Sequence, residues 1–266
     1  MPSIVFASGK GGVGKTSIAL NLGILLAKLG KRVVVVDADL DMAAISIMLG
    51  VELNPITLQN VLAGENSVTD AVYDGPNGLF YIPSSLHEEG KSVDLTRLRE
   101  AVSKLELSYE YVLVDSPPGL SAEARAAITS AQELVIVSTP DPAALIDSLK
   151  IRKFAEKNGV NVIGIALNRA TGDKTEMKPQ DLTNVLGLPV VAILPEDVEV
   201  RRSASMQVPV EVRNPGCGFC KGLRVLAGAL THDQIPESKA GAFSSGGGDS
   251  FFSRIGAFFK KLFGGK

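Results

Sequence analysis

The chain has 266 residues, 45% of them hydrophobic, which suits one large or two small globular domains and argues against extended disorder. Lys and Arg total 27 against 29 Asp and Glu, and the net charge of −2 disfavours a uniformly basic nucleic-acid-binding protein. Cys217 and Cys220 are too few for the disulfide framework of a small secreted protein. We see no secretory signal and no apolar stretch near the roughly 20 residues of a spanning helix, so we expect a soluble, cytoplasmic body.

Short β-branched runs alternate with segments of helical periodicity through residues 1–234. The predicted strands are 3–7, 32–37, 79–82, 111–115, 134–138, 162–167 and 189–193. The helices predicted between them include 15–29, 94–105, 121–131 and 142–157. Because the strands are continuously apolar rather than alternating, helices should cover both faces of the sheet. This order predicts an α/β domain, a doubly wound, mostly parallel sheet flanked by helices.

A glycine-rich loop follows the first predicted strand. Its sequence matches G-x-x-x-x-G-K-T and lies between an apolar strand and a helical pattern, the context that this phosphate-binding motif requires. We expect Lys15 to reach the β- and γ-phosphates of a nucleotide and the Thr16 hydroxyl to bind Mg²⁺. The predicted nucleotide-binding residues here are Gly9, Lys10, Gly11, Gly12, Val13, Gly14, Lys15, Thr16 and Ser17. From its chemistry alone, Lys10 is equally well read as a solvated loop lysine.

Three aspartates, Asp37, Asp39 and Asp115, each end or follow an apolar strand. The carboxyl ends of strands are where ligands bind in an open α/β sheet. Mg²⁺ prefers few protein ligands and keeps several waters, so Thr16 with one or two carboxylates acting through water is the expected site. We assign Asp115 to hold a Mg²⁺-bound water. The alternative for each aspartate is a helix N-cap.

Other polar residues point to nucleotide chemistry less strongly. Asn168 offers the donor and acceptor that recognition of an adenine edge needs, although it could instead start a turn. His87 and His232 have no metal-site spacing and are read as surface residues. No nucleophile with a paired general base is visible, so phosphoryl transfer to water is the favoured reaction.

The last 32 residues differ in composition from the body. Residues 235–250 are rich in Gly and Ser and predict a flexible linker with a reach of roughly 20–25 Å. Residues 251–266 contain four basic residues and no acidic one, so residues 1–250 carry a net charge of −6. If this segment forms a helix, one face is apolar and lysines flank it. The predicted membrane-binding residues are Phe251, Phe252, Ile255, Phe258, Phe259, Lys260, Lys261, Leu262 and Phe263. We predict a membrane-targeting helix on an anionic surface, with docking on the protein's own core as the alternative.

Several segments resemble the MinD/ParA family of dimeric ATPases, and most closely its MinD branch, archaeal forms included. Residues 10–16, KGGVGKT, are similar to the family's deviant Walker A motif. Residues 35–41, VVDADLD, resemble its first switch, and residues 111–120, YVLVDSPPGL, resemble its Walker B strand and second switch. Residues 167–169 and 193–197 match segments near the adenine.

The resemblance implies particular roles and partners. ATP with Mg²⁺ would be the cofactor, and ATP would pair two chains, with Lys10 contacting the partner's phosphates. Asp39 would orient the attacking water and Asp37 would lie near the metal. Asn168, Pro195, Glu196 and Asp197 would lie near the adenine.

The predicted function is therefore an ATPase, converting ATP and water to ADP and phosphate, that switches on and off the inner face of the cell membrane. It would position division-site or other membrane machinery through an unidentified protein partner on the dimer surface. One alternative is a ParA-like DNA segregation ATPase, although the tail makes DNA a disfavoured partner. Another is an iron-sulfur carrier using Cys217 and Cys220, but in such relatives the pair follows an earlier strand. The simpler reading makes both cysteines small, partly buried residues in the first turn of the last body helix.

Overall fold

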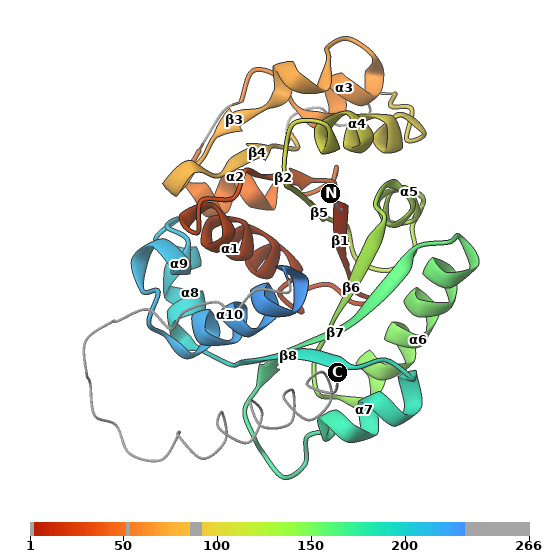
Figure 1. Cartoon of the computed structure of the whole chain (residues 1–266), viewed down its shortest axis with the longest axis vertical. Coiled ribbons are helices and arrows are strands. Elements are labelled where there is room, and N and C mark those ends of the chain that lie inside the picture. Colours follow the sequence, from red (N-terminus) through yellow and green to blue (C-terminus); the bar gives the residue numbers. More distant parts are fainter. Residues whose placement is uncertain (1–2, 52–53, 86–91, 232–266) are drawn as a thin grey trace.

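An eight-stranded sheet forms the centre of the computed structural model, which describes residues 3–51, 54–85 and 92–231 (Figure 1). The strand order is β3-β4-β2-β5-β1-β6-β7-β8, and every pairing is parallel except β3 with β4. The strands are β1 (Ser3–Ala7), β2 (Val33–Asp37), β3 (Tyr73–Asp74), β4 (Phe80–Ile82), β5 (Tyr111–Asp115), β6 (Glu133–Ser138), β7 (Asn161–Ala170) and β8 (Val190–Pro195). The doubly wound, mostly parallel α/β fold is therefore confirmed.

Helices cover both faces of this sheet, as Figure 1 shows. One face packs against α1 (Lys15–Lys28), α2 (Ala44–Leu49), α8 (Val198–Ser205), α9 (Val210–Arg213) and α10 (Gly218–Thr231). The other packs against α3 (Leu58–Ala63), α4 (Arg97–Glu106), α5 (Ala122–Ser130), α6 (Pro142–Lys157) and α7 (Pro179–Leu186). Two 3₁₀ turns, Val68–Ala71 and Pro76–Gly78, lie near the β3 edge.

Strand β1 shows why the strands read as continuous apolar runs. Ile4 and Phe6 belong to the core under α1 and α10, whereas Val5 and Ala7 belong to the opposite core. All four side chains are buried, because successive residues of a strand point to opposite faces and both faces are covered. This burial agrees with the position of β1 in the middle of the sheet, between β5 and β6.

The sequence located seven strands and four of the longer helices, but it gave no separate prediction for β3 or for the short helices α2, α3, α7, α8 and α9. All seven predicted strands are present, with ends that move by up to three residues, and the predicted helix 94–105 begins three residues later, at Arg97. The two-residue strand β3 is too short to give a periodic signal. His87, His232, the linker 235–250 and the helix 251–266 lie outside the described residues, so these predictions stay predictions, as does the domain boundary at residue 234. Among the residues that are described, none of the helices has the length and apolar character needed to cross a bilayer.

Candidate functional site

The glycine-rich loop joins the carboxyl end of β1 to α1. Gly14 has a φ of +97°, and a Cβ built there would lie 2.3 Å from Nδ2 of Asn168. A Cβ on Gly9 would lie 2.1 Å from Cβ of Asp147 on α6. Only glycine fits at these positions. Close packing excludes a side chain at both Gly9 and Gly14, and the positive φ of Gly14 disfavours one there as well.

The start of α1 has no side-chain cap. Its N-cap residue is Gly14, whereas α5 and α6 are capped by Ser121 and Asp141, whose side chains accept N–H groups of the first turn. The first N–H groups of a helix otherwise need a partner, and they carry the positive end of the helix dipole. The loop therefore presents the backbone donors that a phosphate group would occupy.

Lys15 lies inside the loop. Its side chain is buried, and Nζ donates a hydrogen bond to Oγ of Ser8 at 3.0 Å. Burial lowers the pKa of Lys15, while the nearby carboxylates of Asp115 and Asp39 act in the opposite direction. Within the described residues Lys15 forms no ion pair, and an ammonium group set among backbone donors in this way is suited to bind a polyphosphate.

Lys10 has a different environment, although it belongs to the same loop. Its side chain is 40% exposed, and Nζ lies 3.3 Å from Oδ1 of Asp141. Asp141 is itself partly exposed and also accepts the N–H of Ala144 at the start of α6. Lys10 is thus a surface cation at the rim of the site, attached to the neighbouring βα loop.

Asp37 and Asp115 end adjacent parallel strands and lie opposite each other in the register of β2 and β5. Both are buried. Neither oxygen of Asp115 has a hydrogen bond of normal geometry within the described residues. Burial raises the pKa of Asp115 to about 7, and the Thr16 hydroxyl and the Lys15 ammonium partly offset that effect.

These residues fit a hydrated Mg²⁺. A buried carboxylate without donors is costly unless a cation or a cation-bound water meets it. The neighbouring Thr16 hydroxyl and Asp115 are hard oxygen ligands, which Mg²⁺ prefers. Thr16 would hold the ion directly and Asp115 would hold one of its waters.

Asp37 serves the fold as well as the site. Its oxygens accept the N–H of Ile45 at 3.1 Å and the N–H of Asp39 at 3.3 Å. It therefore caps α2 from eight residues upstream, which is the alternative that the sequence left open. Burial and the adjacent charge of Asp115 raise its pKa well above the usual range. Because Asp37 lies opposite Asp115 in the sheet, it is also next to the expected metal position.

Asp39 lies in the loop after β2 and is only partly buried. Burial raises its pKa, while hydrogen bonds from the Met42 and Asp41 amides and the Lys15 charge oppose the rise. Its electrostatic contact with Lys15 places Asp39 on the phosphate side of the site. Its predicted role toward water stays a prediction.

The segment after β5 is joined by hydrogen bonds to the end of β1 and to the start of the loop. The N–H of Gly119 donates to the carbonyl of Ser8 at 2.8 Å, and the Ser116 hydroxyl donates to the carbonyl of Phe6 at 2.8 Å. Movement of residues 116–120 would therefore be transmitted directly to the start of the loop.

Asn168 lies within β7, so the reading that it starts a turn is wrong. It is buried, and its Nδ2 donates to the carbonyl of Val13 at 2.7 Å. This contact joins residues 155 positions apart, and no sequence pattern marks it. Asn168 supports the phosphate-binding loop from the side on which the base is expected.

Residues 195–197 begin with the last residue of β8, Pro195, and continue beside the end of β7. The N–H of Glu196 donates to the carbonyl of Ala170 at 3.0 Å, and the Glu196 carboxylate lies 3.7 Å from Nε of Arg169. Asp197 caps α8 and also accepts the N–H of Phe219 on α10. The structure thus brings the predicted base-side residues to one edge of the site. Sequence analysis missed the connection to α10.

Cys217 and Cys220 occupy the start of α10, and both are buried and unpaired as disulfides. The predicted position at the beginning of the last body helix holds for Cys220, whereas Cys217 directly precedes α10, and both side chains are buried rather than partly buried. The iron-sulfur alternative stays a prediction. Within the described ranges, no group of three or more His, Cys, Asp and Glu side chains forms a potential metal site.

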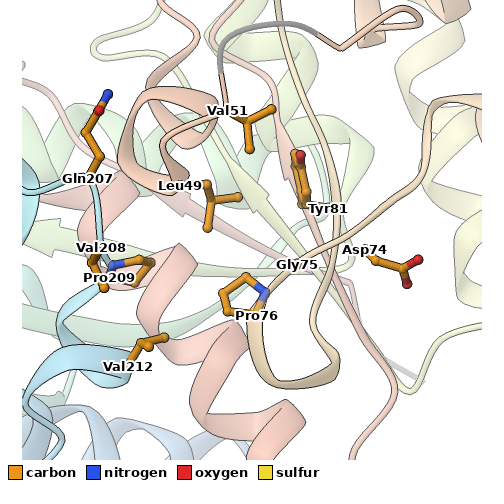
Figure 2. Close-up of a pocket in the computed structure, with 10 residues that line it drawn as sticks. All are labelled: Leu49, Val51, Asp74, Gly75, Pro76, Tyr81, Gln207, Val208, Pro209 and Val212. Atoms are coloured by element: carbon orange, nitrogen blue, oxygen red, sulfur yellow. The ribbon is translucent and has the colours of Figure 1, made fainter.

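A separate apolar cavity of about 250 Å³ lies near the β3 edge of the sheet (Figure 2). It shares no residue with the phosphate-binding loop or the buried aspartates. Its lining comes from α2, the β3–β4 region and the segment from α8 to α9: Leu49, Val51, Asp74, Gly75, Pro76, Tyr81, Gln207, Val208, Pro209 and Val212. Its lining offers no cation for a phosphate group.

A parallel α/β sheet with this loop after its central strand defines the P-loop nucleotide-binding proteins. The model of the CobQ/CobB/MinD/ParA nucleotide binding domain matches residues 4–210, and the chain belongs to this family of P-loop ATPases. ATP with Mg²⁺ is accordingly the cofactor of the site.

Relatives cover nearly the whole chain. An uncharacterized ATP-binding protein of Methanocaldococcus jannaschii is 34% identical over 98% of this chain and 97% of its own length. The septum site-determining protein MinD of Synechocystis is 31% identical over 85% of this chain and 89% of its own. The structure of Pyrococcus horikoshii MinD with Mg-ADP superimposes with a TM-score of 0.82 at 32% identity, covering 86% of this chain and 95% of that one.

Proposed function

We propose that the protein is an ATP-hydrolysing switch that pairs with a second copy when ATP is bound and then holds to anionic membranes. The observation that carries this proposal is the placement of the two loop lysines. Lys15 is buried within the loop, where it donates to Ser8, whereas Lys10 lies at the rim in an exposed pair with Asp141. Exposed pairs contribute at most about 1 kcal/mol, so Lys10 can exchange Asp141 for a nucleotide phosphate in the partner at little cost.

Hydrolysis would use the groups on the phosphate side. When bound, Mg²⁺ neutralises charge on the β- and γ-phosphate oxygens. Lys15 would stabilise the transferring phosphoryl group, and Asp39 would orient the attacking water. The raised pKa of Asp39 makes its carboxylate a stronger base than an exposed aspartate. The products are ADP and phosphate.

Membrane attachment would use residues 251–263. Each basic residue near an anionic surface contributes about 1 kcal/mol, so one tail binds weakly and reversibly. Two tails on one dimer raise the avidity by roughly 10²- to 10⁴-fold without new contacts. ATP binding would thus favour the membrane and hydrolysis would release it. Relatives named septum site-determining proteins support a role in positioning division-site or other membrane machinery.

The test combines ATPase activity with sedimentation on vesicles. The variants are the parent, Lys10→Ala, Lys15→Ala and a chain lacking residues 250–266, each with phosphatidylglycerol or neutral phosphatidylcholine vesicles. The parent should hydrolyse ATP and sediment with anionic vesicles only when ATP is present. Lys15→Ala should lose nucleotide binding, Lys10→Ala should keep binding but lose turnover and sedimentation, and the truncated chain should keep binding but not sediment.

A matched control is Lys150→Ala, which removes another exposed lysine paired with an aspartate, Asp147 at 3.1 Å. It should behave as the parent does. Equal sedimentation of the truncated chain, wild-type turnover by Lys10→Ala, or stimulation by duplex DNA instead of vesicles would contradict the proposal.

A further inference from the structure

Cys217 and Cys220 form a contacting pair of thiols at the start of α10. The N–H of Cys220 donates to Sγ of Cys217 at 3.4 Å, and the Cys220 thiol hydrogen-bonds to the same sulfur. Two cysteines three residues apart at a helix start can close into a disulfide with little backbone movement. Cys217 retains 8% of its surface, whereas Cys220 is fully buried.

The two thiols differ in reactivity. Hydrogen bonding from Cys220 lowers the pKa of Cys217, against the opposing effects of burial and of the facing Asp197 carboxylate. Donation of the same hydrogen bond, burial and the facing Glu211 raise the pKa of Cys220. Cys217 is therefore the partly accessible nucleophile, and Cys220 is the inner thiol that would complete a disulfide.

This pair lies directly against the base-side loop of the nucleotide site. Asp197 accepts the N–H of Glu199 at 2.9 Å and the N–H of Phe219, between the two cysteines, at 3.2 Å. A Cβ on Gly218 would lie 3.0 Å from Cγ of Pro195 and 3.3 Å from Oδ2 of Asp197. A shift in the first turn of α10 would therefore move residues 195–197.

We propose that Cys217 and Cys220 are a redox-active dithiol whose closure to a disulfide weakens adenine-nucleotide binding through Asp197 and the adjoining loop. The inference rests on the proposed role of residues 195–197 beside the base. Closure draws Sγ of Cys217 to bonding distance of Sγ of Cys220 and displaces the turn that carries the Phe219 N–H. Asp197 then loses one of its two backbone donors, and the loop loses its attachment to α10.

The oxidant is a small-molecule disulfide. The Cys217 thiolate attacks one of its sulfurs, the S–S bond breaks, and the first thiolate leaves and takes a proton from solvent. Cys220 then attacks Sγ of Cys217 in the mixed disulfide, and the second thiolate leaves with the Cys220 proton. Two protein thiols are oxidised to one disulfide, and the external disulfide is reduced to two thiols.

The test equilibrates the full chain, without oxygen, in mixtures of reduced and oxidised glutathione. Free thiols are trapped by alkylation and counted by mass spectrometry, and ADP affinity is measured by calorimetry on the fully reduced and fully oxidised protein. We expect the count to fall from two thiols to none within one chain. ADP affinity should fall at least threefold on oxidation and return with dithiothreitol.

Single variants test the assignment of the two thiols. Cys220→Ala should accumulate a mixed disulfide with glutathione on Cys217, whereas Cys217→Ser should leave Cys220 unmodified. Cys217→Ser should bind ADP equally before and after oxidation, with circular dichroism verifying that each variant is folded.

Two free thiols in the most oxidising mixture would overturn the proposal. A disulfide that forms with unchanged ADP affinity would overturn the connection to the nucleotide site. Failure of the reduced protein to bind ADP would instead overturn the proposed function, and with it the connection between the dithiol and the nucleotide site. The thiol count is independent of ADP binding, so it still shows whether the disulfide forms.

Discussion

The phosphate side and the base side of the nucleotide site are built by different physical means. On the phosphate side, Asp37 and Asp115 are buried at the ends of central strands, and Lys15 is buried at the start of α1, close enough to Asp115 to interact with its charge. On the base side, Arg169 and Glu196 are more than half exposed, and hydrogen bonds between loops position residues 195–197. Substitutions should therefore have large effects on the phosphate side and smaller ones on the base side.

Lys15→Ala should have the largest effect. It removes the buried ammonium that offsets the charges of Asp115 and Asp39 and that we propose contacts the phosphates. We expect at least about 100-fold weaker ADP binding in calorimetry, since charged hydrogen bonds contribute about 1.5–3 kcal/mol each. Lys28→Ala, which removes a lysine paired with Glu211 away from the loop, is the control. Equal losses in the two variants would mean that the loss comes from folding.

Asp115 gives a pH-dependent test. Its folded pKa of about 7 lies above the ordinary aspartate value of 3.8, so the folded state binds the proton more tightly than the unfolded chain. Without nucleotide, the free energy of unfolding should fall as pH rises from about 4 to 7, by up to about 1.4 kcal/mol per pH unit from this group. Asp115→Asn should flatten the slope in denaturant titrations and abolish Mg²⁺-dependent ATPase activity. If the substitution leaves the slope of the unfolding free energy against pH unchanged, the raised pKa of Asp115 is contradicted.

Asn168→Ala tests the contact between the two sides. It leaves the buried carbonyl of Val13 without its donor, which costs about 1–3 kcal/mol. We expect roughly tenfold weaker ADP binding together with lower thermal stability. Asn158→Ala is the control, since Asn158 donates to a backbone carbonyl at the exposed end of α6. Similar losses of ADP affinity in both variants would argue against a role for Asn168 in supporting the loop.

Glu196→Gln should have the smallest effect. It removes an ion pair with Arg169 whose partners are both more than half exposed, and such pairs contribute about 0–1 kcal/mol. ADP affinity should change less than threefold in calorimetry. A larger loss would mean that the Glu196 carboxylate contacts the nucleotide itself.

The comparison also explains what the sequence could predict. The phosphate-binding loop and Asp115 were recognisable because local patterns, an apolar strand followed by glycines or an aspartate, determine their positions. The contacts of Asn168 with Val13, of Lys10 with Asp141 and of Asp197 with Phe219 join distant segments. Such contacts depend on which strands become neighbours, and one sequence gives no local sign of them. Asp37 shows both cases, since its strand end and a capping role could be predicted, but its contact with Ile45 on α2 could not.

Molar mass in solution shows whether ATP pairs two copies of the chain through Lys10. Light scattering should be measured on the parent and on Lys10→Ala, each with Mg²⁺ and either ADP or a non-hydrolysable ATP analogue. We expect the mass of the parent to double with the analogue but not with ADP, while Lys10→Ala stays monomeric with both. A parent that stays monomeric when saturated with the analogue, or a Lys10→Ala variant that pairs as well as the parent, would contradict this expectation.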